Sequence, residues 1–153
     1  MMKKITIVMT GIMLLMACHT DKTKEYADEL LQTANSQFEQ KHYDAALQTI
    51  DSLRRTYPKA IDARKQALVL QQNIELTRAQ EELAVVDQAL QKAKADYERM
   101  KRQSEAHHKA GTATADELTR TTLMRMHRDS LQVQFDVQCA KIKYIHKRQK
   151  QVE

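Results

Sequence analysis

Side chains that could carry out chemistry are spread thinly along this sequence, and the histidines are the first to consider. His107 and His108 are adjacent, and imidazole is the commonest metal ligand in proteins. On a helix, however, neighbouring side chains point about 100° apart, so this pair makes a poor chelate without further ligands. No metal-spaced Cys/His set, nucleophile motif, phosphate-binding loop or paired carboxylates can be found. The sequence therefore predicts no enzyme, no metal site and no cofactor.

Positive charge gathers near the carboxyl end of the chain. The cluster consists of Lys141, Lys143, Lys147, Arg148 and Lys150, with His146 among them and only Glu153 as an acidic neighbour. One interpretation is a solvated last turn that complements the helix dipole. The alternative is a surface for an acidic partner, either membrane head groups or an acidic protein surface. These five basic residues are therefore candidate partner-binding residues.

A different kind of chemistry is indicated at Cys18, where a short apolar segment ends. The chain begins with MMKK and is then uncharged from Ile5 to Ala17. A short positive start followed by an apolar stretch is typical of a secretory signal peptide. The stretch is too short to cross a bilayer core, which takes roughly 20 residues. We therefore expect a signal peptide over residues 1–17 and a polar tether over residues 18–23.

Residues 15–18, Leu-Met-Ala-Cys, resemble the lipobox of bacterial lipoproteins. The resemblance implies that Cys18 receives a diacylglyceryl group, that the chain is cut just before it, and that the new amino terminus is acylated. Two or three acyl chains hold a protein firmly on a membrane, whereas one holds it weakly. In this family an Asp after the cysteine favours inner-membrane retention, and His19 stands there instead. The resemblance thus implies a lipid anchor in the outer membrane. We expect the body of the protein to face the periplasm, and the cell exterior is the alternative.

Cys139 is the second cysteine of the chain, and lipidation of Cys18 leaves it without an intramolecular disulfide partner. Such a cysteine either pairs between chains or stays buried. Its apolar neighbours Val137 and Ala140 favour burial.

Composition points to an all-α fold. Beyond Cys18 the only Gly and Pro are Gly111 and Pro58, whereas strand-rich folds need turn residues at regular spacing. Good helix formers such as Ala, Leu, Gln, Lys, Arg and Glu dominate instead. The formal charge of +5 is mild and falls when Lys3 and Lys4 are removed with the signal peptide, so nucleic acid is not an expected partner.

The few helix breaks divide the chain into four helices. We expect helices over residues 23–40 and 43–56, and Tyr57-Pro58 then separates the second from the third. Nothing interrupts a third helix from Lys59 to His107. Gly111 suits its end, and Thr114 to Glu117 fits a capping box that opens a last helix reaching about residue 148. Because so long a helix needs a partner, we expect the last helix to fold back antiparallel on it. The result is a coiled-coil hairpin over residues 59–150 with its tip near residues 108–114.

Apolar spacing on the long helix supports the coiled coil. One seam steps by alternating three and four residues, as in a heptad repeat. Its members are Leu76, Ala79, Leu83, Val86, Leu90, Ala93, Tyr97 and Met100. An earlier register contains Ala60, Ala63, Ala67, Leu70 and Ile74. The irregular step from Ile74 to Leu76 predicts that the packing partner changes there.

The last helix carries a wider and less regular apolar stripe. It contains Leu118, Leu131, Phe135, Ile142 and Ile145, with Val133, Val137, Ala140 and Tyr144 beside them. Folding this helix back from a tip near Gly111 predicts that Tyr97 lies near Thr121 or Met124.

Residues 27–58 resemble one tetratricopeptide repeat, a helical hairpin of about 34 residues. Leu30 falls at the early large position, Ala34 and Ala46 at positions where the helices approach closely, and Pro58 at the close of the repeat. Other matching positions are Phe38, Tyr43, Leu47, Ile50 and Leu53. Lys41 departs from the pattern, since Gly is common there. No second repeat follows, so the start of the long helix is the expected stacking neighbour. The resemblance gives a repeat-like helix pair over residues 24–58 and implies protein or peptide binding, whereas a generic helical hairpin is the alternative.

Three hypotheses about function compete. The first is a lipid-anchored, non-catalytic scaffold or adaptor that binds envelope proteins through its helices and takes part in outer-membrane or envelope assembly. The second is a chaperone-like holdase for unfolded clients in the periplasm. The third is a structural coiled coil that self-associates into a homo-oligomer. The sequence does not choose among the partners that each hypothesis requires.

Overall fold

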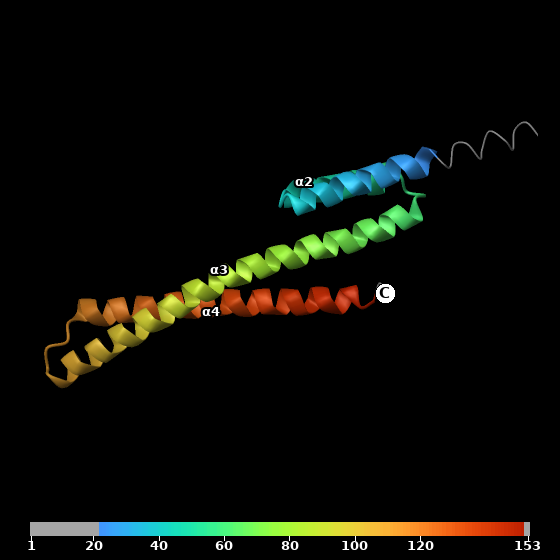
Figure 1. The fold of residues 1–153 in the computed structure, drawn as a ribbon. Coiled ribbons are helices and arrows are strands. Elements are labelled where there is room, and N and C mark those ends of the chain that lie inside the picture. Colours follow the sequence, from blue (N-terminus) through green and yellow to red (C-terminus); the bar gives the residue numbers. More distant parts are fainter. Residues whose placement is uncertain (1–21, 152–153) are drawn as a thin grey trace, which may run out of the picture. The chain divides into compact units, whose positions relative to one another are not determined.

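The computed structural model of this chain describes residues 22–151. Within that range the chain is helical apart from its turns, and it contains no strand. A first helix spans residues 22–39, and α2 (Tyr43–Thr56), α3 (Ile61–Lys109) and α4 (Ala115–Gln149) follow (Figure 1). The all-α prediction is confirmed, and every predicted helix is present with its ends within a few residues of the expected ones. The first helix already includes residues 22 and 23, which were expected to end the tether.

Two of the turns have the same hydrogen-bonded geometry. At the end of the first helix the backbone N–H groups of Lys41 and His42 donate to the carbonyls of Phe38 and Gln37, at 2.9 and 2.8 Å. This is a Schellman motif, which requires a left-handed residue at Lys41, where φ is 61°. Gly adopts this conformation without a steric penalty, so Lys41 is an unusual residue for such a turn. The turn after α3 repeats the pattern with Gly111, whose φ is 69°.

The chain divides into two compact units between Ile74 and Glu75, inside α3. We call the described residues 22–74 the first unit and residues 75–151 the second unit. The boundary coincides with the irregular step between the two apolar registers of the long helix. Pro58, in contrast, separates two helices of the same unit.

The first unit is a three-helix assembly in which small residues face one another. Ala27, Ala34 and Ala46 are completely buried, and the absence of larger side chains lets the helix backbones approach closely. The start of α3 shares this core, as expected for the stacking neighbour of the helix pair. The buried cluster comprises Ala27, Leu31, Ala34, Ala46, Ile50, Leu53, Ala63, Ala67, Leu70 and Ile74. Each fully buried Ile or Leu side chain contributes roughly 1.5–3 kcal/mol.

The second unit is the predicted antiparallel hairpin, formed by the rest of α3 and by α4 (Figure 1). It begins at Glu75 and not at residue 59, because the earlier part of α3 packs in the core of the first unit. Leu90 and Ala93 of α3 pack with Leu131 of α4, and all eight residues of the predicted α3 seam are buried or half-buried. Toward the boundary with the first unit, the Gln138 amide donates a 2.8 Å hydrogen bond to the Glu82 carboxylate. At the tip, the N–H of Glu117 donates to Thr114 Oγ1 at 3.2 Å, which confirms Thr114 as the cap of α4.

The core contacts of the hairpin agree with the expected register. Leu90 packs with Leu131, and seven residues toward the tip on each helix lead from this pair to Tyr97 and Met124. The guanidinium of Arg128, one helical turn from Met124, lies 4.3 Å from the centre of the Tyr97 ring.

Two expectations for α4 are wrong. Cys139, predicted to be buried, is exposed, because its side chain lies outside the face defined by Leu131 and Ile145. Leu118, predicted to belong to the inner stripe, is 47% exposed. Leu131 and Ile145 are buried, while Phe135 and Ile142 are half-buried.

Candidate binding surface on α4

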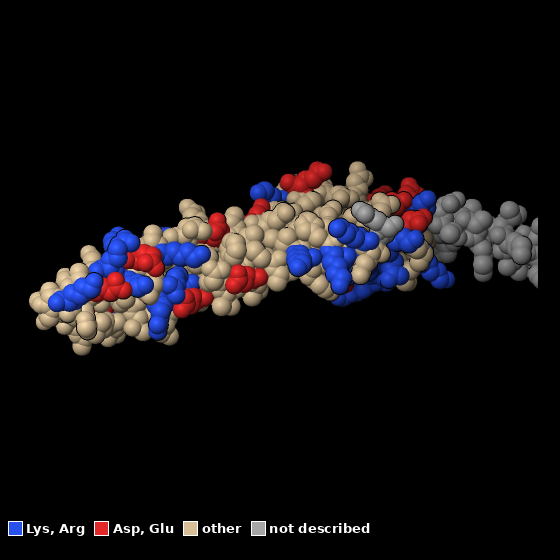
Figure 2. All heavy atoms as spheres, turned by 90° about the horizontal axis from the view of Figure 1, so that it is seen from below, with Lys and Arg blue, Asp and Glu red and all other residues tan. Residues whose placement is uncertain are grey.

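The five candidate basic residues are all exposed, four of them in the last turns of α4 and Lys150 at its C-cap. Figure 2 shows Lys and Arg side chains gathered over the C-terminal part of α4, with few acidic side chains among them. The structure separates the five into two groups. Lys143, Lys147 and Lys150 line a groove, whereas Lys141 and Arg148 are not among its lining residues.

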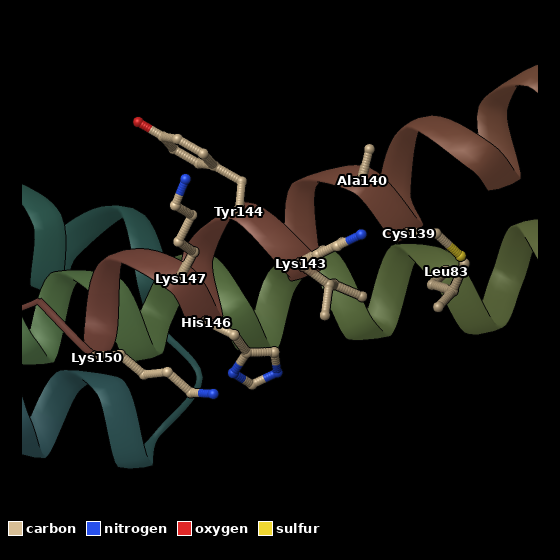
Figure 3. Close-up of a pocket in the computed structure, with 9 residues that line it drawn as sticks. Leu83, Cys139, Ala140, Lys143, Tyr144, His146, Lys147 and Lys150 are labelled. Atoms are coloured by element: carbon tan, nitrogen blue, oxygen red, sulfur yellow. The ribbon is translucent and has the colours of Figure 1, made fainter.

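The groove is shallow, has a volume of about 800 Å³ and is open to solvent. Its lining residues are Leu83 of α3, the C-cap residue Lys150, and Cys139, Ala140, Ile142, Lys143, Tyr144, His146 and Lys147 of α4. In Figure 3 Leu83 lies beside Cys139, while Tyr144 and Lys147 stand on one side of α4 and His146 and Lys150 on the other. The surface that it offers is mostly apolar, and three lysines are among its lining residues.

This combination suits an occupant that is apolar on one side and anionic at its margins. Lysine side chains cover apolar surface with their stems while their charged ends remain in water. The ends can therefore meet carboxylates without being desolvated, and each such exposed contact is worth up to about 1 kcal/mol. The same lysines would repel a basic occupant.

The neighbouring face of α4 is apolar and exposed to solvent. Val133, Val137 and Tyr144 are each more than half exposed, as are Leu123 and Met126 nearer the tip. We define the outer seam as these residues together with the two exposed small ones between them. In chain order it consists of Leu123, Met126, Ser130, Val133, Val137, Ala140 and Tyr144.

The outer seam is a regular heptad pattern. Its members step by three and four residues in strict alternation from Leu123 to Tyr144, which is the spacing of a coiled-coil contact line. Sequence reasoning had placed Val133, Val137, Ala140 and Tyr144 beside the inner stripe. The alternating spacing distinguishes the outer seam from the inner stripe in the sequence. Only the burial of Leu131 and Ile145 shows that the inner stripe is the set that faces α3.

Among the other charged contacts of the second unit, some lie within α4 and others join α3 to α4. A hydrogen bond from Arg128 to Asp129 raises the pKa of Arg128 above its ordinary value, and this cation also lies over Tyr97. At the tip, His107 Nδ1 lies 2.8 Å from the Glu117 carboxylate. Within residues 22–151 no group of three or more His, Cys, Asp or Glu side chains is arranged to hold a metal ion.

Two sequence predictions concern the membrane. Cys18, the signal peptide and most of the tether lie outside the described residues. Among the helices that are described, none combines the length and the apolar character needed to span a bilayer.

Comparisons with known proteins give no relative from which to transfer a function. No protein-family model matches the chain, and searches of curated proteins and of solved structures found no significant match.

Proposed function

We propose that this chain is a lipid-anchored, non-catalytic scaffold of the bacterial cell envelope that binds other proteins through the exposed surface of α4. The observation that carries the binding part is the outer seam, because a long, regular apolar line on a helix is favourable only when another surface covers it. The basic groove beside it adds a preference for an acidic partner.

Heptad spacing also indicates the form of the partner. A seam with alternating steps of three and four fits a second helix, whose side chains pack between those of the first. Binding to a flat or irregular partner surface would not require regular heptad spacing on α4. We therefore expect the occupant of the α4 surface to present a helix with an apolar line and acidic flanks.

The anchoring part of the proposal rests on the sequence. The lipobox-like residues 15–18 support acylation of Cys18, and His19 supports an outer-membrane destination. With the helical body on the periplasmic side, the α4 surface is available to proteins of the envelope and takes part in their assembly.

Replacement of Cys18 tests the anchor, and Cys139 supplies a matched control in the same chain. Cys18→Ala is expected to abolish incorporation of a labelled fatty acid and to release the protein from washed membranes. Cys139→Ala is expected to change neither. Membrane association of Cys18→Ala equal to that of the unsubstituted protein would remove this part of the proposal.

Crosslinking in intact bacterial cells, followed by affinity capture and mass spectrometry, tests the binding surface. We expect Lys143→Glu combined with Lys147→Glu to lose specific partners, because both lysines line the groove. The double replacement Lys92→Glu with Lys101→Glu alters exposed lysines of α3 and serves as the control. Equal capture by both double variants would place the partner elsewhere on the molecule.

A holdase is a second candidate, since exposed apolar side chains bordered by lysines also suit unfolded clients. A light-scattering assay with an aggregating client separates the two functions. The scaffold proposal predicts no suppression of aggregation, whereas suppression that disappears in Val137→Glu would favour the holdase.

A further inference from the structure

Charged residues along one edge of the outer seam follow a pattern of their own. Asp129, Asp136, Lys143 and Lys150 follow one another at intervals of seven residues. The first three directly precede the seam residues Ser130, Val137 and Tyr144, and Lys150 continues the same spacing. All four are exposed and lie on the same edge of α4. The edge is therefore acidic in its first half and basic in its second half.

We propose that the occupant of the outer seam is a second copy of this chain, whose α4 lies antiparallel to the first. The inference rests on the proposal that α4 is a binding surface, but it does not depend on the lipid anchor. It narrows the general expectation of self-association to one face, one orientation and one register.

The charge order determines the orientation. In an antiparallel pair of α4 helices, this charged edge of one copy lies beside the same edge of the other copy and runs in the opposite direction. The acidic half of the edge in one copy therefore meets the basic half in the other. Asp136 then lies opposite Lys143 of the second copy, and Asp129 lies opposite its Lys150. Symmetry repeats both pairings, as in any isologous dimer. Because Asp129 is already ion-paired with Arg128, the Asp136 pairings carry most of the preference.

The same register brings apolar seam residues together. Val137 of one copy faces Ala140 of the other, and Val133 faces Tyr144, each pairing again occurring twice. The small side chain of Ala140 beside Val137 allows the two helices to approach closely. Ala140 and Tyr144 also line the basic groove, so the second helix covers part of that groove and brings Asp136 to its lysines.

A parallel pair would be electrostatically worse. It would align the basic cluster from Lys141 to Lys150 of one copy with the same cluster of the other, and like charges in contact positions are destabilising. It would also set Lys143 against Arg148 of the second copy. The antiparallel arrangement instead separates the two basic clusters toward opposite ends of the pair.

Sedimentation of the full chain in density-matched detergent provides the first test. We expect a dimer at micromolar concentration, and we expect Val137→Glu to sediment as a monomer with unchanged helical circular dichroism. Val85→Glu is the control, because Val85 is 70% exposed on α3 and outside the outer seam. A monomeric wild-type chain, or equal weakening by both variants, overturns the proposal. A monomer that still captures envelope proteins would overturn it while leaving the proposed function standing.

Charge reversal tests the orientation. Asp136→Lys and Lys143→Asp are each expected to weaken self-association by at least about tenfold, because each places like charges opposite each other twice. An equimolar mixture of the two variants is expected to restore the dimer, since every edge pairing in the mixed dimer is again between opposite charges. A parallel pair predicts instead that Lys143→Asp strengthens association, because the introduced carboxylate would then face Arg148. That result, or the absence of restoration in the mixture, contradicts the antiparallel proposal.

Discussion

Ile50 lies in the centre of the apolar cluster of the first unit, with 1% of its surface exposed, and its replacement by Ala tests how that unit is held together. Truncation removes three carbon atoms, which at ~0.8 kcal/mol per methylene amounts to roughly 2.5 kcal/mol of transfer free energy. A residual cavity adds to this, and Ile→Ala replacements in protein cores typically cost about 2–5 kcal/mol. We expect Ile50→Ala to lower the free energy of unfolding of the first unit by about 3 kcal/mol. Ile61→Ala, at a residue 54% exposed, should cost less than about 0.5 kcal/mol.

Amide hydrogen exchange measured by mass spectrometry can assign this loss to one unit. A cost of about 3 kcal/mol corresponds to roughly 100-fold faster exchange for protected amides of α2 that open with the unit. Because the two units divide at Ile74, amides of residues 84–100 should keep their protection. Uniformly faster exchange through both units would refute the division, and unchanged exchange in α2 would refute the burial of Ile50 as a source of stability.

Three further predictions follow from individual contacts. Thr114→Ala removes the side-chain acceptor of the Glu117 N–H and should cost about 1 kcal/mol, seen as faster exchange in the first turn of α4, whereas Thr119→Ala should not have this effect. Gln72 is 2% exposed, and its side-chain amide atoms have no hydrogen-bond partner within the described residues, so Gln72→Met should raise the thermal midpoint of unfolding. A lower midpoint would show that the amide is hydrogen-bonded in solution. Cys139 is exposed, so a maleimide should label its thiol as fast in the native protein as in the denatured protein. Slow labelling of the native protein would indicate that the thiol is buried.

Much of the fold was predictable because helix ends depend on local chemistry. The left-handed residue Gly111 and the cap at Thr114 are marked by residue type alone, and both were identified correctly. The change of apolar register at Ile74 predicted a change of packing partner, and the two compact units meet there, whereas the domain boundary itself was expected at residues 58–59. These features require no knowledge of distant parts of the chain.

The candidate site was predicted only in part, because its organisation depends on which face of α4 packs on α3. Sequence spacing gave α4 one broad apolar stripe, and it could not show that Leu131 turns inward while Val133 and Val137 turn outward. For the same reason Cys139 was assigned to the interior. The basic residues were recognised from composition, but their division between a groove and an open surface follows from the path of α4 beside Leu83.

Site-specific photo-crosslinking in intact cells tests the central claim most directly, namely that the outer face of α4 binds another protein. A photoreactive residue replaces Val137 in the outer seam or, as the control, Val85 on α3, which is also an exposed valine. We predict a discrete crosslinked product from position 137, either with a second copy or with another envelope protein, and none from position 85. The absence of a product from position 137, or the same products from both positions, would contradict the claim.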